Sequence, residues 1–272
     1  MNPLDLLLSA CLSVDYPGKP GVLRNASLEM RNGEVLGLVG QSGAGKSTIA
    51  LSLMKLLDLK SGRVSGSLCF RGRDLLQMKE REIRQLRGRE IALVQQSPLA
   101  SLNPAMRIRT QLAEAWRAHL NGPGDLCERA IFDAVRSVNL PADETFLRRY
   151  PSQLSVGQAQ RVLIAMAIIH HPSLLIADEP TSALDVITQA EILALFRDLN
   201  RRWGVGILFI SHDLPSVASI CTRIAILHDG EVVESGNTEQ IFCRPSHSYT
   251  QQLLLAQPTM PFRMPEQGQF LS

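Results

Sequence analysis

One stretch decides the fold: Val35-Leu36-Gly37-Leu38-Val39, followed at once by Gly40-Gln41-Ser42-Gly43-Ala44-Gly45-Lys46-Ser47. The first part reads as a buried strand, and the second matches the G-x-x-x-x-G-K-S pattern of a phosphate loop. Its glycines allow successive backbone N–H groups to point at phosphate oxygens. Lys46 would reach the β- and γ-phosphates, and the Ser47 hydroxyl would ligate Mg²⁺. We expect a helix over residues 47–57, whose positive end faces the same phosphates, so the stretch predicts a nucleoside triphosphate site.

Composition excludes several classes of protein. The 272 residues are 45% hydrophobic and 20% charged, which allows one large domain or two small ones. The formal net charge of +2 is too small to attract nucleic acid or an anionic membrane through the overall electrostatic field of the protein. The five cysteines are widely spaced and never form C-x-x-C, so we expect neither a disulfide framework nor a zinc site, and a reducing, cytosolic compartment fits best. No apolar run reaches the roughly 18 residues that a membrane-spanning helix needs.

One segment near the start suggests a different compartment. Leu8-Ser9-Ala10-Cys11 is similar to the cleavage box of a bacterial lipoprotein. No Lys or Arg precedes it, however, and Asp5 interrupts an apolar stretch that is short for a signal core. We therefore interpret this segment as part of a first strand.

The order of apolar runs predicts an α/β protein with a mainly parallel core sheet, in which phosphate binds at the carboxyl ends of the strands. The expected core strands are 35–39, 91–94, 174–177, 206–210 and 224–227. The runs 6–15, 22–30 and 67–70 predict a small antiparallel sheet that flanks the nucleotide.

Between Ser97 and His171 the strand signal disappears, which predicts a helical insertion. We expect helices over 111–120 and 126–138, with a capping box formed by Asp125 and Glu128. The second helix would bury its apolar face, namely Ala130, Ile131, Ala134, Val135 and Val138. We interpret the charged segment 79–90 as a solvated helix face.

These patterns predict a single domain over residues 1–250. Its nucleotide-binding core would comprise 1–96 and 172–236, and its helical subdomain 97–171. After Gly236 we expect a polar tail over 237–272, with its last dozen residues disordered.

An apolar strand ends in two carboxylates, Asp178 and Glu179. Asp178 would hold Mg²⁺ directly or through water, as the second acidic element of a P-loop ATPase does. Glu179 would orient and polarise the attacking water, because phosphoryl transfer needs positioning and charge stabilisation. The alternative interpretation is a solvated acidic turn.

The pentapeptide Leu154-Ser155-Val156-Gly157-Gln158 precedes a helical run over 159–169. Together with the phosphate loop and Asp178-Glu179, it resembles the ATP-binding-cassette (ABC) ATPases, whose signature is Leu-Ser-Gly-Gly-Gln; Val156 departs from this pattern. The resemblance implies that Ser155 and Gly157 face the γ-phosphate bound by an opposite subunit. It also implies that two cassettes pair head to tail around shared nucleotides. A helix start here would aim its N–H groups at a phosphate.

Other elements follow the family order. Tyr16 resembles the aromatic residue that stacks on adenine, although it could equally be a packing residue. Gln96, with Gln95 as an alternative register, resembles the glutamine that senses Mg²⁺ and water. Asp185 lies in a segment that resembles the loop through which two paired cassettes contact each other. Alternatively, Asp185 could cap a helix. His212 resembles the switch histidine on the γ-phosphate. We expect His119, His170, His171 and His228 to be ordinary surface or core residues.

The resemblance therefore implies ATP and Mg²⁺ as cofactors and assigns three sets of residues. The catalytic residues would be Lys46, Gln96, Glu179 and His212. The Mg²⁺ ligands would be Ser47, Gln96 and Asp178. The residues contacting ATP would be Tyr16, Gly40, Gln41, Ser42, Gly43, Ala44, Gly45, Lys46, Ser47, Thr48, Ser155, Gly157, Gln158 and Asp185.

Two segments narrow the subfamily. Ser101-Leu102-Asn103-Pro104 and Pro245-Ser246-His247-Ser248-Tyr249-Thr250 resemble ATPase subunits of bacterial oligopeptide, dipeptide and nickel importers. Taken alone, the second segment reads as a surface loop. The resemblance implies an ATPase on the cytoplasmic face of the bacterial inner membrane, paired with a second ABC ATPase, which is the same or a paralogous chain. It would dock on two permeases that are fed by an extracytoplasmic binding protein. A groove beside Gln96 would receive the permease's coupling helix.

Two other functions stay open. Cassettes that look like the dipeptide importers' also occur as accessory subunits of the phosphonate C–P lyase system, a cytoplasmic enzyme complex. DNA-repair, chromosome and translation ATPases usually carry long coiled-coil insertions or two cassettes in one chain, and neither feature is visible in this sequence. We expect no nucleic-acid partner.

Overall fold

A six-stranded sheet carries the phosphate loop near its centre in the computed structural model, which describes residues 5–120 and 122–256. The strand order is β10-β9-β3-β8-β7-β6. All neighbouring pairs are parallel except β9 with β10, which is antiparallel. The strands are β3 (Val35–Val39), β6 (Ile91–Val94), β7 (Leu174–Asp178), β8 (Gly206–Ser211), β9 (Arg223–His228) and β10 (Glu231–Asn237). The predicted α/β class with a mainly parallel sheet is confirmed.

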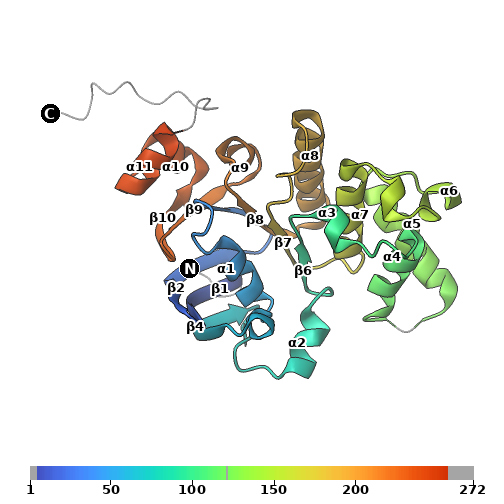
Figure 1. Cartoon of the computed structure of the whole chain (residues 1–272), viewed down its shortest axis with the longest axis horizontal. Helices are drawn as coiled ribbons and strands as arrows, with labels where there is room; N and C mark the ends of the chain where they lie inside the picture. The colour runs from blue at the N-terminus through green and yellow to red at the C-terminus, as the bar shows by residue number, and fades with distance from the viewer. Residues whose placement is uncertain (1–4, 121, 257–272) are drawn as a thin grey trace.

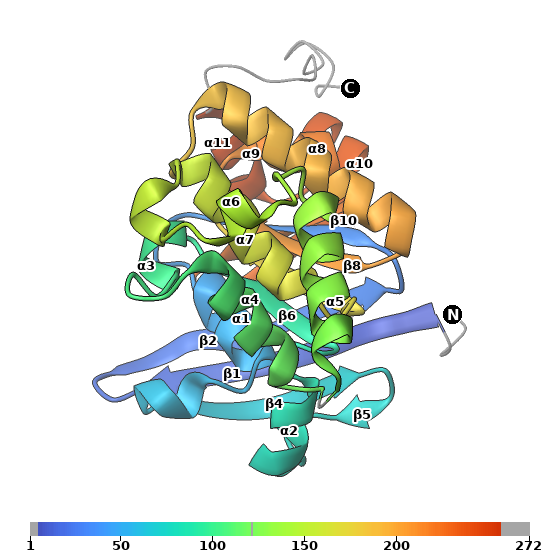
Figure 2. The ribbon, with the colours of Figure 1, turned by 90° about the vertical axis from the view of Figure 1, so that its right-hand side faces the viewer.

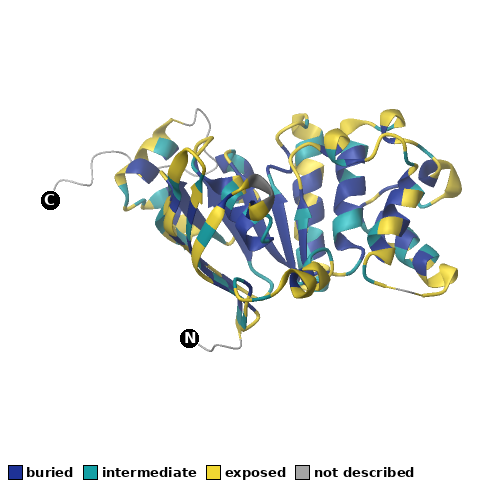
Figure 3. Cartoon of the chain, turned by 60° about the horizontal axis from the view of Figure 1, so that its bottom comes forward, coloured by how far each residue is buried: buried dark blue, intermediate teal, exposed yellow. Residues whose placement is uncertain are grey.

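The parallel strands of the sheet are buried on both faces, as a parallel sheet requires, whereas the antiparallel edge strand β10 is exposed or half-buried. Every residue of β3 and β8 is buried. Alternate residues of β3 enter two different hydrophobic clusters: Val35 and Val39 face one, and Leu36 and Leu38 face the other. Figure 3 shows this buried layer of strands between more exposed helices and loops. The continuous apolar run at 35–39 is therefore explained by packing on both sides.

A second, four-stranded antiparallel sheet has the order β2-β1-β4-β5. Its strands are β1 (Leu6–Tyr16), β2 (Lys19–Arg31), β4 (Arg63–Phe70) and β5 (Arg73–Asp74). The lipoprotein-like segment 8–11 lies within β1, where it pairs with β2 and with β4. The interpretation of that segment as a strand is confirmed.

The helices cover the sheets in two groups (Figure 1). One group lies on the face of the second hydrophobic cluster with the antiparallel sheet: α1 (Lys46–Leu53), η2 (Leu57–Lys60) and α2 (Glu80–Leu86). On the other side lie α8 (Val186–Trp203) and α9 (Leu214–Ile220).

Between β6 and β7 the chain forms a helical insertion. Its helices are α3 (Pro98–Ser101), α4 (Ile108–Arg117), α5 (Gly124–Ser137), α6 (Glu144–Leu147), η3 (Pro151–Gln153) and α7 (Val156–Ile168). Helices α4, α5 and α7 pack against each other, as Figure 2 shows, so the predicted helical insertion is confirmed.

Some predicted details are wrong. The predicted capping box of Asp125 and Glu128 is not formed: α5 begins at Gly124, and Glu128 pairs with Arg109 of the neighbouring helix instead. Ala130 is half-buried, whereas the other four predicted apolar positions of α5 are buried. Helix α1 stops at Leu53, four residues before the predicted end. Strand β6 has the predicted bounds, Ile91–Val94.

The predicted C-terminal extension after Gly236 forms helices in its described part. Strand β10 runs to Asn237 and is followed by α10 (Thr238–Cys243) and α11 (Ser248–Leu255). Tyr249 and Thr250 are buried, which does not fit the surface loop that this segment suggests when taken alone. The predicted disorder of the last dozen residues falls outside the described residues. None of the described helices combines the length and the apolar character needed to cross a bilayer.

Candidate active site

The phosphate loop connects β3 to α1 and depends on glycine at three positions. Gly43 and Gly45 have φ values of 84° and 108°, which residues with a side chain rarely adopt. A Cβ atom on Gly40 would lie 2.3 Å from the carbonyl oxygen of Leu227. Helix α1 begins after Gly45 with no side-chain cap, so the N–H groups of its first turn face the loop. This backbone is suited to an anion such as a phosphate.

A cavity of about 610 Å³ opens beside this loop, within the usual range for a small-molecule site. Its lining combines backbone amides with side chains from distant parts of the chain. The lining residues are Tyr16, Lys19, Val22, Gly40, Gln41, Ser42, Gly43, Gly45, Lys46, Ser47, Thr48, Gln96, Glu179, His212 and Leu253. The backbone amides of the phosphate loop and Lys46 suit a triphosphate. The ring of Tyr16 and the apolar side chains of the lining suit a nucleoside.

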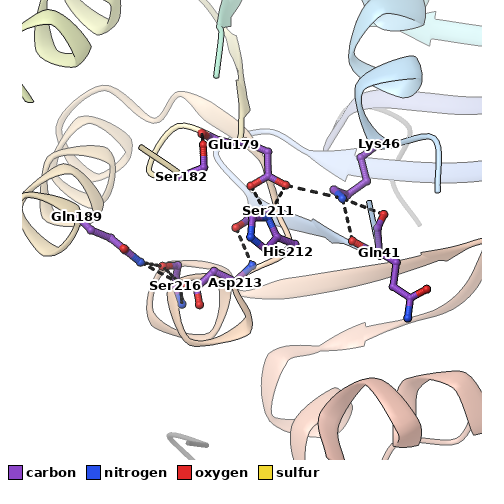
Figure 4. Close-up of polar contacts among 10 residues, drawn as sticks. Gln41, Lys46, Glu179, Ser182, Gln189, Ser211, His212, Asp213 and Ser216 are labelled. Atoms are coloured by element: carbon purple, nitrogen blue, oxygen red, sulfur yellow. Dashed lines mark hydrogen bonds and ion pairs between the residues drawn. The ribbon is translucent and has the colours of Figure 1, made fainter. Parts of the chain in front are cut away.

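Lys46 is buried, with 7% of its surface exposed. Its Nζ atom donates hydrogen bonds to the carbonyl oxygens of Gly40 and Gln41, at 2.8 and 3.1 Å. The same atom lies 3.7 Å from a carboxylate oxygen of Glu179, as Figure 4 shows. The ammonium group therefore already lies between the loop and the acidic residue, where a phosphate would need it.

Glu179 follows β7 and is 8% exposed. Its φ value of 50° is unusual for a residue with a side chain and costs on the order of 1–2 kcal/mol. The carboxylate accepts a hydrogen bond from Nδ1 of His212, which lies 3.0 and 2.9 Å from its two oxygens. Strain at a buried carboxylate between Lys46 and His212 is typical of a functional site.

His212 follows β8 and is held in place by its neighbours. The Asp213 N–H donates to the Ser211 hydroxyl at 3.0 Å. The Asp213 carboxylate accepts from Nε2 of Gln189 at 2.9 Å and also from Ser216, which ties the turn to α8 and α9 (Figure 4). The turn that presents His212 is therefore fixed by two helices.

The predicted metal ligands offer a hydroxyl, an amide and a carboxylate oxygen. Ser47 and Gln96 line the cavity, and the half-buried Asp178 ends β7 next to Glu179. Oxygen ligands that leave several positions for phosphate and water are what Mg²⁺ prefers. Among the described residues, no group of three or more His, Cys, Asp or Glu side chains could hold a metal by itself. The residues therefore fit Mg²⁺ bound together with a phosphate.

The signature segment forms the start of α7. Ser155 caps this helix: its hydroxyl accepts from the Gln158 N–H at 3.1 Å, and the Gln158 side chain accepts from the Ser155 N–H at 3.2 Å. Ser155 and Val156 are exposed. Ser155, Gly157, Gln158 and Asp185 lie outside the set of described residues that line the cavity. The signature thus presents its helix end to solvent rather than to the phosphate loop of its own chain.

Asp185 caps α8 in the way that the alternative interpretation predicted. Its carboxylate accepts from the N–H groups of Ile187 and Thr188 at 3.1 and 3.0 Å and from the Thr188 hydroxyl at 2.7 Å. The bond from the Thr188 backbone lowers the pKa of Asp185. A Cβ atom on Gly157 would lie 2.6 Å from Cγ2 of Thr188. Thr188 therefore links the signature to the Asp185 loop within one chain.

The cavity brings together most of the predicted site. Besides the signature residues and Asp185, two predicted residues are not among the lining residues: Asp178, and Ala44, which packs against the second hydrophobic cluster. The sequence analysis missed Lys19, Val22 and Leu253, which belong to β2 and α11. Lys19 and Val22 carry no motif. The four-residue spacing of Tyr249 and Leu253 is the one signal that could have indicated a helix here.

The four histidines that we expected to be ordinary residues, His119, His170, His171 and His228, lie outside the cavity lining. The rings of His119 and His170 meet edge to face with centroids 5.1 Å apart, and burial lowers the pKa of both. His171 contacts Trp203 in a similar way. His228 stacks on Tyr249.

Comparison with known proteins agrees with this geometry. The family model described as "ABC transporter" matches residues 23–182. The chain is 43% identical over 251 residues to the "Glutathione import ATP-binding protein GsiA" of Escherichia coli O157:H7, an alignment that covers 89% of this chain and 40% of the relative. It is 39% identical over 246 residues to the "Oligopeptide transport ATP-binding protein OppD" of Bacillus subtilis (strain 168), with 90% and 69% covered. The chain thus spans about two fifths of the length of the glutathione-import relatives.

Solved structures give the same fold. The dimeric post-hydrolysis structure of the ATP-binding cassette MJ0796 bound to ADP and Pi has a TM-score of 0.72 at 26% identity, covering 86% of this chain and 98% of that one. The structure of cbiO1 from Clostridium perfringens, part of the ABC transporter complex cbiONQ, has a TM-score of 0.74 at 24% identity, covering 93% and 96%.

Proposed function

This chain belongs to the ABC transporter family, and from that premise we propose that it is the subunit that binds and hydrolyses ATP to energise a membrane importer. The observation that carries the proposal is the convergence of Lys46, Glu179 and His212 on one cavity beside the phosphate loop. These three side chains come from the carboxyl ends of three neighbouring parallel strands, where a P-loop fold binds phosphate.

In the proposed mechanism each side chain has its own task. Lys46 leaves the loop carbonyls and Glu179 and binds the β- and γ-phosphates. The carboxylate of Glu179, freed from Lys46, accepts a hydrogen bond from the attacking water and orients it in line with the γ-phosphate. His212 exchanges its hydrogen bond to Glu179 for one that it donates to the γ-phosphate as negative charge develops there. When bound, Mg²⁺ neutralises charge on the β- and γ-phosphates; Ser47, Asp178 and Gln96 would hold it.

We propose further that each ATP is shared by two subunits. The exposure of Ser155 and Val156, away from their own chain's cavity, supports this, because the free end of α7 is suited to a phosphate held elsewhere. The dimeric state of the ADP-bound cassette MJ0796 supports it too. Nucleotide would then favour the closed dimer through contacts that the open dimer lacks, and hydrolysis would reopen it. Asp185 would carry contacts between the subunits, and the partner would be a second copy or a paralogue.

The relatives support a proposal for the cargo and the partners. They are named as ATP-binding proteins of glutathione import and of oligopeptide transport, which favours a small peptide as cargo and favours import over an accessory role in phosphonate breakdown. A nickel chelate is the other cargo class that the sequence resemblance suggests. We propose two permeases as partners, a location on the cytoplasmic face of the inner membrane, and an extracytoplasmic binding protein that delivers the cargo. Residues 97–171 would receive the permease.

ATPase assays on single variants test the proposal. We expect Lys46→Ala to lose nucleotide binding or turnover, and Glu179→Gln to bind ATP with little turnover. EDTA should abolish hydrolysis of the wild-type chain. Lys79→Ala is the matched control, because Lys79 is exposed and lies outside the cavity lining. An unchanged rate in Lys46→Ala would overturn the phosphate-loop assignment, and full turnover by Glu179→Gln would remove that residue from its catalytic role.

A further inference from the structure

The C-terminal helix α11 lies against the nucleotide cavity, although it is far from the phosphate loop in sequence. Tyr249, in the first turn of α11, is 7% exposed. Its hydroxyl oxygen accepts a hydrogen bond from the backbone N–H of Gln41, 3.3 Å away. One turn later, Leu253 lines the cavity. A single helix thus contacts both the loop and the wall of the site.

The Tyr249 ring is fixed by a second contact at the end of β9. It stacks on the ring of His228, with centroids 3.7 Å apart and an angle of 18° between the planes. The residue before His228 is Leu227, whose carbonyl oxygen allows no side chain at Gly40. The end of β9 and the start of α11 therefore contact successive residues of the phosphate loop, Gly40 and Gln41.

Helix α11 is itself tied to the core sheet. The carboxylate of Glu234 in β10 accepts from the N–H groups of Ser246 and His247, at 2.7 and 3.1 Å. His247 caps the helix, because its Nδ1 atom accepts from the Tyr249 N–H at 3.2 Å. These hydrogen bonds fix the start of α11, and with it Tyr249, relative to the core sheet.

The contact with Gln41 continues into the catalytic cluster. The carbonyl oxygen of Gln41 accepts from Nζ of Lys46, and the same Nζ lies beside Glu179. Tyr249 on the N–H side and Lys46 on the carbonyl side therefore hold the same loop residue. The intervening Gly43 and Gly45 leave the loop backbone free to adopt other conformations if one of these bonds is lost.

We propose that α11 is part of the nucleotide site: Tyr249 is a positioning residue that holds the Gln41 amide and keeps the phosphate loop in its binding form, and Leu253 forms part of the cavity wall. This inference rests on the proposed ATP binding. If the loop adopts its binding form only part of the time, the apparent Kd for nucleotide rises in inverse proportion to that fraction.

The size of the effect follows from one neutral hydrogen bond. The net contribution of such a bond corresponds to a rise of about three- to tenfold in apparent Kd when it is lost. Saturating ATP selects the binding form of the loop, so kcat should change little while KM rises. A purely structural role of Tyr249 would lower thermal stability without this division between KM and kcat.

The test compares Tyr249→Phe, which keeps the ring that stacks on His228, with the matched control Tyr150→Phe in the helical insertion, whose hydroxyl contacts Arg107. Binding of a fluorescent ATP analogue gives Kd, and hydrogen exchange over residues 36–46 reports on the loop without ATP. We expect the Tyr249 variant to raise Kd and KM about three- to tenfold and to speed exchange in this segment. The control should match the wild type.

A second pair of variants tests the contribution of Leu253 to the cavity wall, independently of the hydrogen bond between Gln41 and Tyr249. Leu253→Ala should raise Kd about two- to fivefold, since it removes apolar contact area from the cavity wall. Leu255→Ala, on the same helix but 63% exposed and outside the lining, should leave Kd unchanged. Wild-type Kd and exchange in both Tyr249→Phe and Leu253→Ala, with binding or turnover still lost in Lys46→Ala, would overturn the role of α11. Normal binding together with normal turnover in Lys46→Ala would instead overturn the nucleotide site and this inference with it.

Discussion

The contact between Gly157 and Thr188 gives a sharp test of the link between the signature and the Asp185 loop. Gly157→Ala would place its Cβ 2.6 Å from Cγ2 of Thr188, a distance at which the Thr188 side chain or one of the two helices must shift. Overpacking of this kind costs about 1–3 kcal/mol. The higher helix propensity of alanine offsets roughly 0.5–1 kcal/mol of that cost.

The change Thr188→Ser removes Cγ2 but keeps the hydroxyl that Asp185 accepts from. The clash is then absent in the double variant, and the helix gain of alanine cancels in the double-mutant cycle. We expect a coupling free energy of about 1–3 kcal/mol that favours the double variant. This corresponds to roughly 2–4 °C in Tm for each kcal/mol.

The coupling is obtained from thermal unfolding of the wild type, the two single variants and the double variant. Their ATPase rates are measured alongside. Gly124→Ala is the control, because a Cβ atom there meets nothing within 4 Å, and we expect it to be neutral or slightly stabilising. Strictly additive effects, or a Gly157→Ala variant with wild-type Tm and rate, would refute the claim that Thr188 joins the two segments.

Three further predictions concern other sites. Gln96→Ala should weaken stimulation by the permease more than ATP affinity, and equal losses in both measurements would contradict a coupling role. Burial raises the pKa of the Cys221 thiol, so iodoacetamide should modify Cys221 only after unfolding, while the half-buried Cys69 serves as the reactive control in mass spectrometry. Burial lowers the pKa of His170, so the unfolded chain takes up the proton first and stability falls as pH drops below about 6.5. His170→Gln should flatten this decline in urea titrations, and an unchanged slope would refute the assignment.

Sequence reasoning succeeded where local chemistry determines structure. The loop at Gly40–Ser47 needs glycines and a lysine at fixed places, and the strands beside it need continuous apolar runs because both faces are buried. Glu179 was predicted from its place at a strand end and His212 from the family resemblance, and the parallel sheet brings the two side chains within 2.9 Å.

The rest depends on contacts between distant segments. Tyr249 is adjacent to Gln41 only because β9 and β10 carry α11 back to the loop, and the spacing of Tyr249 and Leu253 could indicate the helix but not this contact. The predicted cap at Asp125 failed because Glu128 pairs with Arg109 of another helix. Likewise, the steric requirement at Gly157 comes from Thr188, a residue of α8 that no motif singled out.

The central claim is that ATP lies between two subunits, so that the signature of one meets the phosphate loop of the other. Hydrogen exchange on the Glu179→Gln chain, together with the chains that copurify with it, tests this claim most directly. We predict that ATP protects residues 40–48 and residues 154–158, and that protection of the second segment grows with protein concentration. Protection of 40–48 alone, or protection of 154–158 that is independent of concentration, would contradict the claim.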